Sequence, residues 1–287
     1  SIVGYGQWSD VVCVSEIGKP LYNFYGYVVE GVYESLEDIE NSPKTAKHPA
    51  NGVYNRANTV WVGDLKYKDI NEDGKIDDKD RTDIGSPLPK FTFGWNNTFR
   101  YKGFDLNIFL NGSYGNKVLN YSLMNGPSGG LASMRSAWVN QNNDAIKDRA
   151  QLAPIDPDKV YEDGSMWYND ITNVKVKNSG TKTPRPTLND PNDNDRLSTR
   201  YIEDGSYLRI KNLTLGYTFP KKWMQKAHFD NIRVYCNIQN LYTFTKYSGY
   251  DPEVGASTQD SSGYAYGVDN GRYPSPTTYS FGVSLTF

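Results

Sequence analysis

The chain has 287 residues, and its 31 Lys or Arg and 33 Asp or Glu leave a net charge of −2, which gives no reason to expect a nucleic-acid partner. Aromatic residues make up 14% of the sequence, and 26 residues are glycine; this composition argues against disorder and against a helical bundle, and it favours β-structure. The only cysteines, Cys13 and Cys236, and the two histidines exclude a disulfide scaffold and a Cys/His zinc site. No apolar run reaches the roughly 18 residues of a membrane-spanning helix, but spanning strands of about 9–11 alternating residues escape that test.

Residues 1–90 predict a loop region with short elements of secondary structure. Residues 23–33 favour a strand, and Ser35 followed by Asp38 resembles a capping box that begins a short helix. Nothing in this region supplies further long alternating strands.

Residues 69–80 match the EF-hand calcium loop, with oxygen-bearing side chains at positions 1, 3, 5, 9 and 12 and Gly74 at position 6. The predicted ligands are Asp69, Asn71, Asp73, Asp77 and Asp80 and the backbone carbonyl of Lys75. Ile76 is expected to anchor the loop in a neighbouring core, and Asp80, which is shorter than the usual Glu, predicts weak binding. The alternative is a solvated acidic loop, because residues 69–83 carry seven acidic side chains and three basic ones.

Five segments alternate apolar and polar residues with the period of a strand that has one apolar face. They are residues 91–100, 104–114, 213–219, 232–242 and 277–287. In the last segment Tyr279, Phe281 and Val283 share one face, while the other face is small, polar and uncharged. Residues 91–287 therefore predict strands whose apolar face meets hydrocarbon and whose polar face lines a lumen.

The connections between these segments alternate in length. Three residues join the first pair and about a dozen join the third segment to the fourth, whereas more than 80 residues follow the second segment and about 30 precede the last. Short periplasmic turns and long outer loops are typical of outer-membrane barrels. We therefore predict an all-β fold, an antiparallel transmembrane β-barrel, with an extracellular loop region at residues 1–90 and long extracellular loops at residues 115–205 and 246–275. Because five strands are too few to close a barrel, we expect the natural protein to be longer, rather than several chains sharing one barrel.

The long loops contain the remaining candidate site residues. Trp138 and Trp167 are candidates for stacking on sugar rings or gripping peptides, although such residues more often pack the small core of a loop. Residues 184–196 are turn-forming throughout. No catalytic triad and no phosphate-binding glycine loop is evident, so we do not expect an enzyme.

Several motifs together resemble the C-terminal part of SusC/RagA-type TonB-dependent transporters of Bacteroidetes, and the resemblance covers essentially the whole chain. The matching segments are residues 18–21 (GKPL), 24–27 (FYGY), 63–67 (GDLKY) leading into the 69–80 loop, 80–87, 89–91, 112–116 (GSYGN), 206–220 and 237–241 (NIQNL). The resemblance implies a 22-stranded barrel with an N-terminal plug, energised through the TonB complex. It also implies a SusD-like surface lipoprotein as partner and oligosaccharides or peptides as imported substrates.

The family resemblance leaves alternatives open. Neither a plug nor a TonB-binding segment is evident here, so we expect this chain not to gate or couple energy alone. A passive outer-membrane porin and a secreted, calcium-stabilised ligand-binding β module are the other two hypotheses. The sustained alternation up to Phe287 opposes the secreted module.

Overall fold

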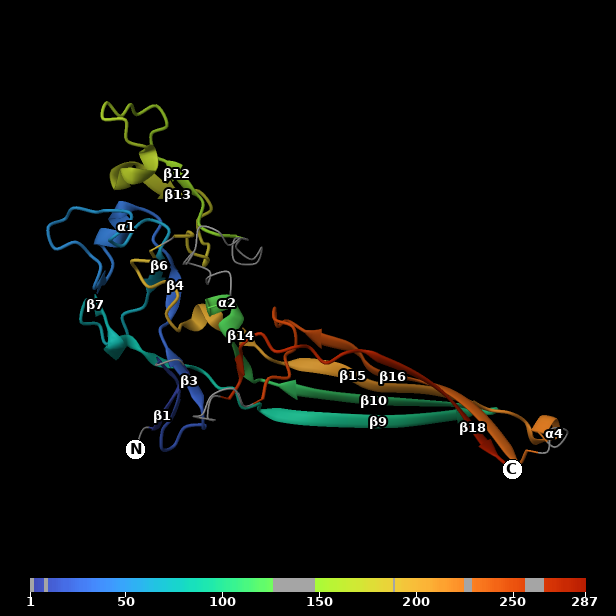
Figure 1. The fold of residues 1–287 in the computed structure, drawn as a ribbon. Coiled ribbons are helices and arrows are strands. Elements are labelled where there is room, and N and C mark those ends of the chain that lie inside the picture. The colour runs from blue at the N-terminus through green and yellow to red at the C-terminus, as the bar shows by residue number, and fades with distance from the viewer. Residues whose placement is uncertain (1–2, 8–9, 126–147, 188, 225–228, 256–265) are drawn as a thin grey trace. The chain divides into compact units, whose positions relative to one another are not determined.

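The computed structural model describes residues 3–7, 10–125, 148–187, 189–224, 229–255 and 266–287 (Figure 1). The chain forms two compact units, and each draws on segments that lie far apart in the sequence. Unit 1 comprises Ser1–Ser86, Leu119–Glu203 and Gly255–Gly271, and unit 2 comprises Pro87–Val118, Asp204–Val254 and Arg272–Phe287.

Unit 2 is built on a five-stranded antiparallel sheet with the order β18-β16-β15-β10-β9. Its strands are β9 (Phe91–Tyr101), β10 (Phe104–Tyr114), β15 (Tyr207–Thr218), β16 (Asn231–Thr245) and β18 (Thr278–Thr286). The short helix α4 (Lys221–Met224) lies in the connection between β15 and β16. All five alternating segments of the sequence are therefore strands, as predicted.

The connections also alternate in length as predicted, although the first is one residue shorter than expected because Tyr101 belongs to β9. β9 and β10 are joined by Lys102 and Gly103 alone, and both have positive φ angles, 47° and 89°. Two positive φ angles are what a type I′ hairpin turn requires, and glycine adopts them without strain. The turn therefore matches the twist of the two strands that it connects.

One strand begins earlier than the sequence predicts. β15 starts at Tyr207, whereas the alternation indicates a strand only from residue 213. The reason is that Lys211 is an extra residue opposite β10: Phe109 pairs with Asn212, but the next residue of β10 pairs with Ile210. Such a bulge changes the phase of the apolar–polar alternation. The first half of the strand is therefore out of phase with the second half, and the two do not form one continuous pattern.

Unit 1 contains several small sheets. A four-stranded sheet has the order β1-β2-β3-β8, with strands β1 (Val3–Gln7), β2 (Asp10–Ser15), β3 (Asn23–Gly26) and β8 (Thr82–Gly85). The two-stranded pairs are β4 (Val29–Val32) with β6 (Leu65–Tyr67), β5 (Lys44–Thr45) with β7 (Lys75–Ile76), and β12 (Leu152–Pro154) with β13 (Val174–Val176).

A further three-stranded sheet and the short helices complete the secondary structure. The sheet has the order β14-β11-β17, with strands β14 (Ile202–Asp204), β11 (Lys117–Asn120) and β17 (Val268–Asp269). The helices are α1 (Leu36–Glu40), α2 (Tyr121–Asn125) and the 3₁₀ helices η1 (Asp78–Asp80), η2 (Trp167–Asn169), η3 (Ile171–Asn173) and η4 (Thr199–Tyr201). Among the described residues, no helix is both long and apolar enough to cross a membrane.

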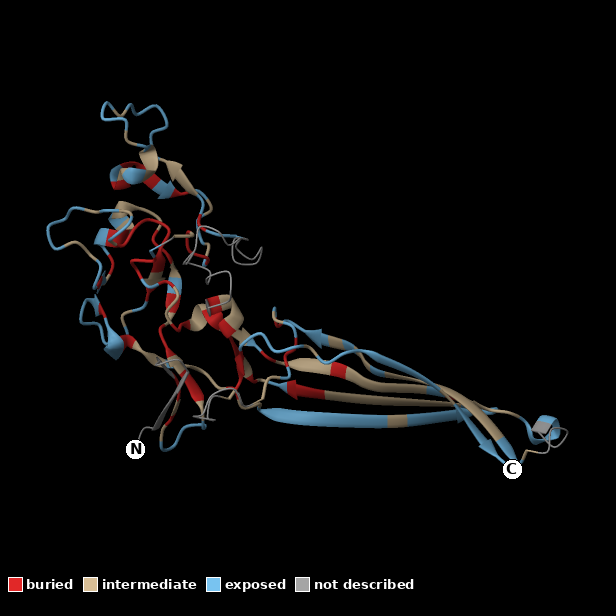
Figure 2. Cartoon of the chain, in the orientation of Figure 1, coloured by how far each residue is buried: buried red, intermediate tan, exposed pale blue. Residues whose placement is uncertain are grey.

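Two clusters of buried side chains form the cores of unit 1, and Figure 2 shows these buried residues in red. The larger cluster surrounds the fully buried Trp61 and includes Leu65 and Ile76. The smaller one gathers Phe24 and Tyr201 from distant parts of the chain. The strands of the unit 2 sheet, in contrast, are mostly exposed or half-buried. Unit 1 is thus held by its own interior, whereas the large apolar side chains of the sheet face outward.

Helix α1 begins as the sequence predicts. The Ser35 side chain accepts a hydrogen bond from the Asp38 N–H (3.2 Å), and the Asp38 carboxylate accepts one from the Glu34 N–H (3.0 Å). The first bond satisfies a backbone donor that the first turn of a helix leaves without a partner, and the second holds the residue before the cap.

Candidate functional site

The apolar face of the unit 2 sheet extends over all five strands, with Asn97 of β9 as a polar residue on it. The strand register aligns one apolar row, Phe99, Leu106, Leu215, Cys236 and Phe281. Phe99, Leu215 and Phe281 are exposed, Phe281 to 80%, and Leu106 and Cys236 are half-buried. A charge at the middle of a bilayer costs about 2–4 kcal/mol on a barrel strand, and this row contains none. This face is therefore suited to hydrocarbon.

The opposite face of the same sheet is polar. The row next to the apolar one is Thr98, Asn107, Thr214, Asn237 and Ser280. Asn107 donates hydrogen bonds to the Asn96 side-chain oxygen (2.8 Å) and the Thr98 hydroxyl (2.9 Å). Adjacent rows of opposite character confirm the two faces that the sequence predicts.

A salt bridge lies across the polar face. Arg233 on β16 donates to both carboxylate oxygens of Asp105 on β10, at 3.0 and 2.6 Å, although β15 lies between these strands. Gly216 on β15 leaves the necessary room, because a Cβ atom there would come within 2.6 Å of both side chains. The ion pair can therefore form across β15 because residue 216 has no side chain.

Aromatic rings gather at the end of the sheet where the connections are short. Tyr217 packs against Phe104 (centroids 4.6 Å apart) and Phe219 (5.1 Å), and the ring of Phe229 lies 5.4 Å from that of Phe287. Amphipathic and apolar rings at one level are typical of a membrane–water interface.

The acidic loop at residues 69–80 is packed on unit 1 as predicted. Ile76 is buried in the larger core, and β7 pairs with β5 through Lys75 and Ile76. The Asp69 carboxylate accepts a hydrogen bond from the Gly74 N–H (2.7 Å), which closes the loop where Gly74 has a φ of +81°. The first six residues of the loop therefore form a tight turn with a glycine at its sharpest point.

The two ends of the loop meet at Asp80. Its fully buried carboxylate accepts hydrogen bonds from the N–H groups of Ile70 (2.9 Å) and Asp77 (2.8 Å). Burial raises the pKa of Asp80, but the backbone hydrogen bonds from Asp77, Ile70 and Asn71 outweigh it, so the pKa lies below its usual range. Asp80 is therefore ionised at neutral pH.

The other predicted ligands are engaged within the loop. Asn71 donates to the Asp73 carboxylate (3.0 Å), and the Asp77 side chain accepts from the Lys79 N–H (2.8 Å). One oxygen of Asp69, Oδ1, is buried without a hydrogen-bond partner. Within the described part of the chain, no three Asp, Glu, His or Cys side chains are grouped so that they hold a metal ion. Calcium binding stays a prediction.

A buried polar network in unit 1 was not predicted from the sequence. Asp64 is fully buried, and its carboxylate pairs with Arg185 (Nε–Oδ1 2.8 Å, Nη2–Oδ2 3.2 Å) and accepts from the Trp61 N–H (2.8 Å). The Nε–Oδ1 contact is an ion pair but not a hydrogen bond. The network thus joins the 63–67 motif to a segment more than a hundred residues further along the chain.

Asn192 and Asn194 extend this network. The Asn194 side chain accepts from the Leu65 N–H (2.7 Å) and donates to Asp190 (2.7 Å), while Asn192 donates to the Leu65 carbonyl (2.9 Å). Both backbone polar groups of Leu65 in β6 are thus hydrogen-bonded to side-chain carboxamides. Residues 190–194, which the sequence marks only as turn-forming, hold the core in place.

The two predicted ligand-binding tryptophans differ in position. Trp138 lies outside the described residues. Trp167 is half-buried in η2, packs against the larger core and contacts the ring of Tyr168 (5.7 Å, edge-on). Its role in binding stays a prediction.

No protein-family model matches the chain. The chain is 31% identical over 275 residues to TonB-dependent receptor P3 of Formosa agariphila, an alignment that covers 94% of this chain and 22% of that protein. It is 27% identical over 222 residues to TonB-dependent receptor SusC of Bacteroides thetaiotaomicron, with 77% of this chain and 17% of that receptor covered. The chain thus spans less than a quarter of the length of these two relatives.

Solved structures of the RagAB peptide transporter, and of the RagAB peptide importer in an open-open state, resemble the chain with TM-scores of 0.56 and 0.55. Both are 19% identical, and they cover 97% and 98% of this chain and 24% of theirs. The likeness shows the fold, which is that of part of an antiparallel transmembrane β-barrel. The open sheet of unit 2, with β9 and β18 at its edges, agrees with this.

Proposed function

Because this chain belongs to the SusC/RagA-type family of TonB-dependent receptors, we propose that it is part of an outer-membrane importer of large nutrients. Its place is the bacterial outer membrane. The observation that carries the proposal is the pair of adjacent rows in the unit 2 sheet, where Phe281 faces outward among apolar neighbours and Ser280 lies in the polar row. A wall of this kind separates lipid from an aqueous passage.

The energy source distinguishes this proposal from a passive porin. An importer coupled to the TonB complex takes up its substrate against a gradient, so uptake stops when the proton-motive force is lost. We expect cells that produce the natural protein to accumulate a labelled oligomer, and a protonophore to abolish the accumulation. Uptake that continues unchanged after the protonophore would establish the porin function instead.

A SusD-like surface lipoprotein is the proposed partner, and oligosaccharides or peptides are the proposed substrates. The support is the similarity to a receptor named SusC and to the structures of the RagAB peptide importer. Affinity purification of the natural protein from outer membranes tests the partner: a lipoprotein should co-purify in equal amount. Recovery of the protein alone, with uptake intact, would contradict it.

The 69–80 loop is the proposed structural calcium site of this importer. Its donors are all oxygen atoms, which Ca²⁺ prefers, and the buried Asp69 Oδ1 lacks a partner that a cation would supply. Binding would replace the hydrogen bonds that Asn71 and Asp73 now make within the loop. The expected role is to order the loop, and an affinity of about 10⁻⁴–10⁻³ M suffices outside the cell.

Calorimetric titration of the natural protein with calcium tests this site. Asp73→Asn removes a predicted ligand charge, and Glu72→Gln removes an exposed charge at a non-ligand position of the same loop. We expect the first change to weaken calcium binding about tenfold or more, and the second to leave it nearly unchanged. Equal weakening by both, or no binding at millimolar calcium, would identify a solvated acidic loop.

A further inference from the structure

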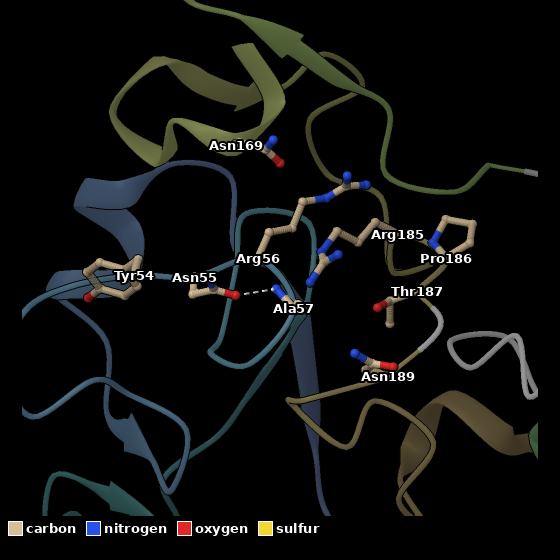
Figure 3. Close-up of a pocket in the computed structure, with 9 residues that line it drawn as sticks. All are labelled: Tyr54, Asn55, Arg56, Ala57, Asn169, Arg185, Pro186, Thr187 and Asn189. Carbon is tan, nitrogen blue, oxygen red and sulfur yellow. Dashed lines mark hydrogen bonds between the residues drawn. The ribbon is translucent and has the colours of Figure 1, made fainter. Parts of the chain in front are cut away.

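A pocket of about 600 Å³ lies in unit 1 beside η2 (Figure 3). Its lining includes two arginines, Arg56 and Arg185, and three uncharged polar side chains, Asn169, Thr187 and Asn189. In this view the arginines lie at the centre, with Asn169 above them and Thr187 and Asn189 below. The volume lies within the range of about 300–1,000 Å³ that is common for small-ligand sites.

The two arginines differ in their charge balance. Arg185 is buried, and its guanidinium pairs with the fully buried Asp64. That carboxylate also accepts hydrogen bonds from Trp61 and Asn194, so its lone pairs are used within the core. Asp64 therefore pairs with Arg185, and its oxygens are taken up by this pair and by the core hydrogen bonds.

Arg56 is the second cation. It forms no ion pair with any carboxylate that the structure describes, and its buried Nε has no hydrogen-bond acceptor. Its guanidinium lies over the ring of Tyr168, 5.0 Å from the centroid. Burial and then the neighbouring charge of Arg185 lower the pKa of Arg56, but a guanidinium stays protonated in proteins. The pocket therefore holds one uncompensated positive charge.

The backbone that carries Arg56 is held in a fixed turn. The Asn55 side chain accepts from the Ala57 N–H (2.9 Å), the dashed line in Figure 3, and the Thr59 hydroxyl accepts from the Asn55 N–H (2.9 Å). This turn fixes where the Arg56 side chain starts, and the Tyr168 ring supports its guanidinium, which reduces the entropy lost on binding.

We propose that this pocket binds a carboxylate group of the imported substrate, with Arg56 as its charge partner. One positive charge matches one singly charged oxyanion, and the planar guanidinium fork fits a carboxylate with two parallel hydrogen bonds. The carboxamides of Asn169 and Asn189 and the hydroxyl of Thr187 are placed to bind neutral polar groups next to it. This inference rests on the proposed import function for the origin of the ligand, and it assigns that ligand a negative charge.

A uronic-acid oligosaccharide and an acidic peptide both carry such a carboxylate. Binding is measured by calorimetry on the natural protein, purified in detergent, with two matched pairs of probes. The first pair is trigalacturonic acid and its methyl ester. The second is a pentapeptide with blocked ends and one central aspartate, and its asparagine analogue.

We expect at least one charged probe to bind about tenfold or more tightly than its neutral analogue, which is the usual worth of a charge-assisted hydrogen bond in a binding site. Arg56→Gln should remove this preference and Arg56→Lys should keep most of it. Lys47→Gln, which removes an exposed charge elsewhere in unit 1, should leave it unchanged. The pair that discriminates identifies the source of the carboxylate.

Three results would overturn the proposal: charged and neutral probes that bind equally in both pairs, a preference that survives Arg56→Gln, or a preference that Lys47→Gln removes equally. Heat-dependent gel mobility confirms that each variant has an assembled barrel. Because binding is measured without transport, a failed uptake assay leaves this result intact, and a failed titration leaves the uptake assay intact.

Discussion

Asp190 is a buried carboxylate of unit 1 whose ionisation depends strongly on the fold. Burial raises the pKa of Asp190 to about 7, although its carboxylate accepts hydrogen bonds from the Asn194 side chain and the Asp195 N–H. The charge of the neighbouring Asp64 acts in the same direction as burial. At neutral pH this carboxylate is therefore poised between its two protonation states.

The raised pKa of Asp190 predicts a pH dependence of stability. An unfolded Asp titrates near pH 4, so between about pH 4 and 7 the folded state holds a proton that the unfolded state has released. The contribution of Asp190 to stability is therefore fully present below pH 4 and is lost as the pH rises through 7. A difference of one between the folded and unfolded pKa values corresponds to about 1.4 kcal/mol of stability.

Amide hydrogen exchange across residues 190–196, corrected for intrinsic rates, measures this effect locally. We expect the opening free energy to fall between roughly pH 4 and roughly pH 7, the interval between the ordinary pKa of an aspartate and the raised pKa of Asp190, and to change little above it. Asp190→Asn should remove most of the fall, whereas Asp193→Asn, at an exposed position of the same segment, should not. The same fall in the Asp190→Asn variant would assign the pH dependence to another group.

The local sequence predicts the burial and the partners of some residues but not of others. The burial of Ile76 follows from its place in the calcium-loop pattern, and the structure confirms it. The pairing of Asp64 with Arg185 has no such local pattern, because the partners are 121 positions apart. Nothing in the residues around Asp64 distinguishes a buried, paired carboxylate from an exposed one.

At the scale of the element, alternation predicts strands because it records which side chains face lipid. β18 shows this most directly, since Phe281 is 80% exposed and the residues on either side of it, Ser280 and Gly282, are small. β15 shows the limit: the bulge at Lys211 keeps the apolar side chains on one face by breaking the period that identifies the strand. The small strands of unit 1 are too short to establish a period and depend on their partners.

A charge placed on each face of β18 tests the assignment of the faces. Phe281→Arg puts a charge in hydrocarbon and should cost about 2–4 kcal/mol near the midplane, so less of the protein should assemble into a heat-modifiable barrel. Ser280→Arg, one residue away on the polar face, should cost far less. Equal losses from the two variants would contradict this assignment of the faces.

At the scale of the molecule, residues from three separate stretches combine into each unit. The sequence predicts the sheet of unit 2, whose strands carry their own periodic pattern. It does not predict that residues 119–203 share buried cores with residues 1–86, because a core that contains both Phe24 and Tyr201 joins segments without any repeating signal. The side of the membrane on which each loop lies also remains a prediction.

Labelling of intact cells with a membrane-impermeant maleimide tests the topology. The parent protein has Cys13 and Cys236 replaced by Ala. Asp158→Cys, at an exposed position in the predicted extracellular loop 115–205, should be labelled. Lys221→Cys, at an exposed position in α4, should be labelled only after the cells are broken, because α4 lies in a predicted periplasmic connection. The opposite pattern would invert the orientation.

The alternation of lipid and water along one strand is the most direct test of the account. Spin labels are placed one at a time at positions 279–284 of the cysteine-free protein in lipid vesicles, and their accessibility to oxygen and to a water-soluble nickel complex is measured by electron paramagnetic resonance. Labels at 279, 281 and 283 should be more accessible to oxygen, and those at 280, 282 and 284 to the nickel complex. Accessibilities that do not alternate, or that alternate in the opposite phase, would contradict the barrel wall that this sheet is taken to form.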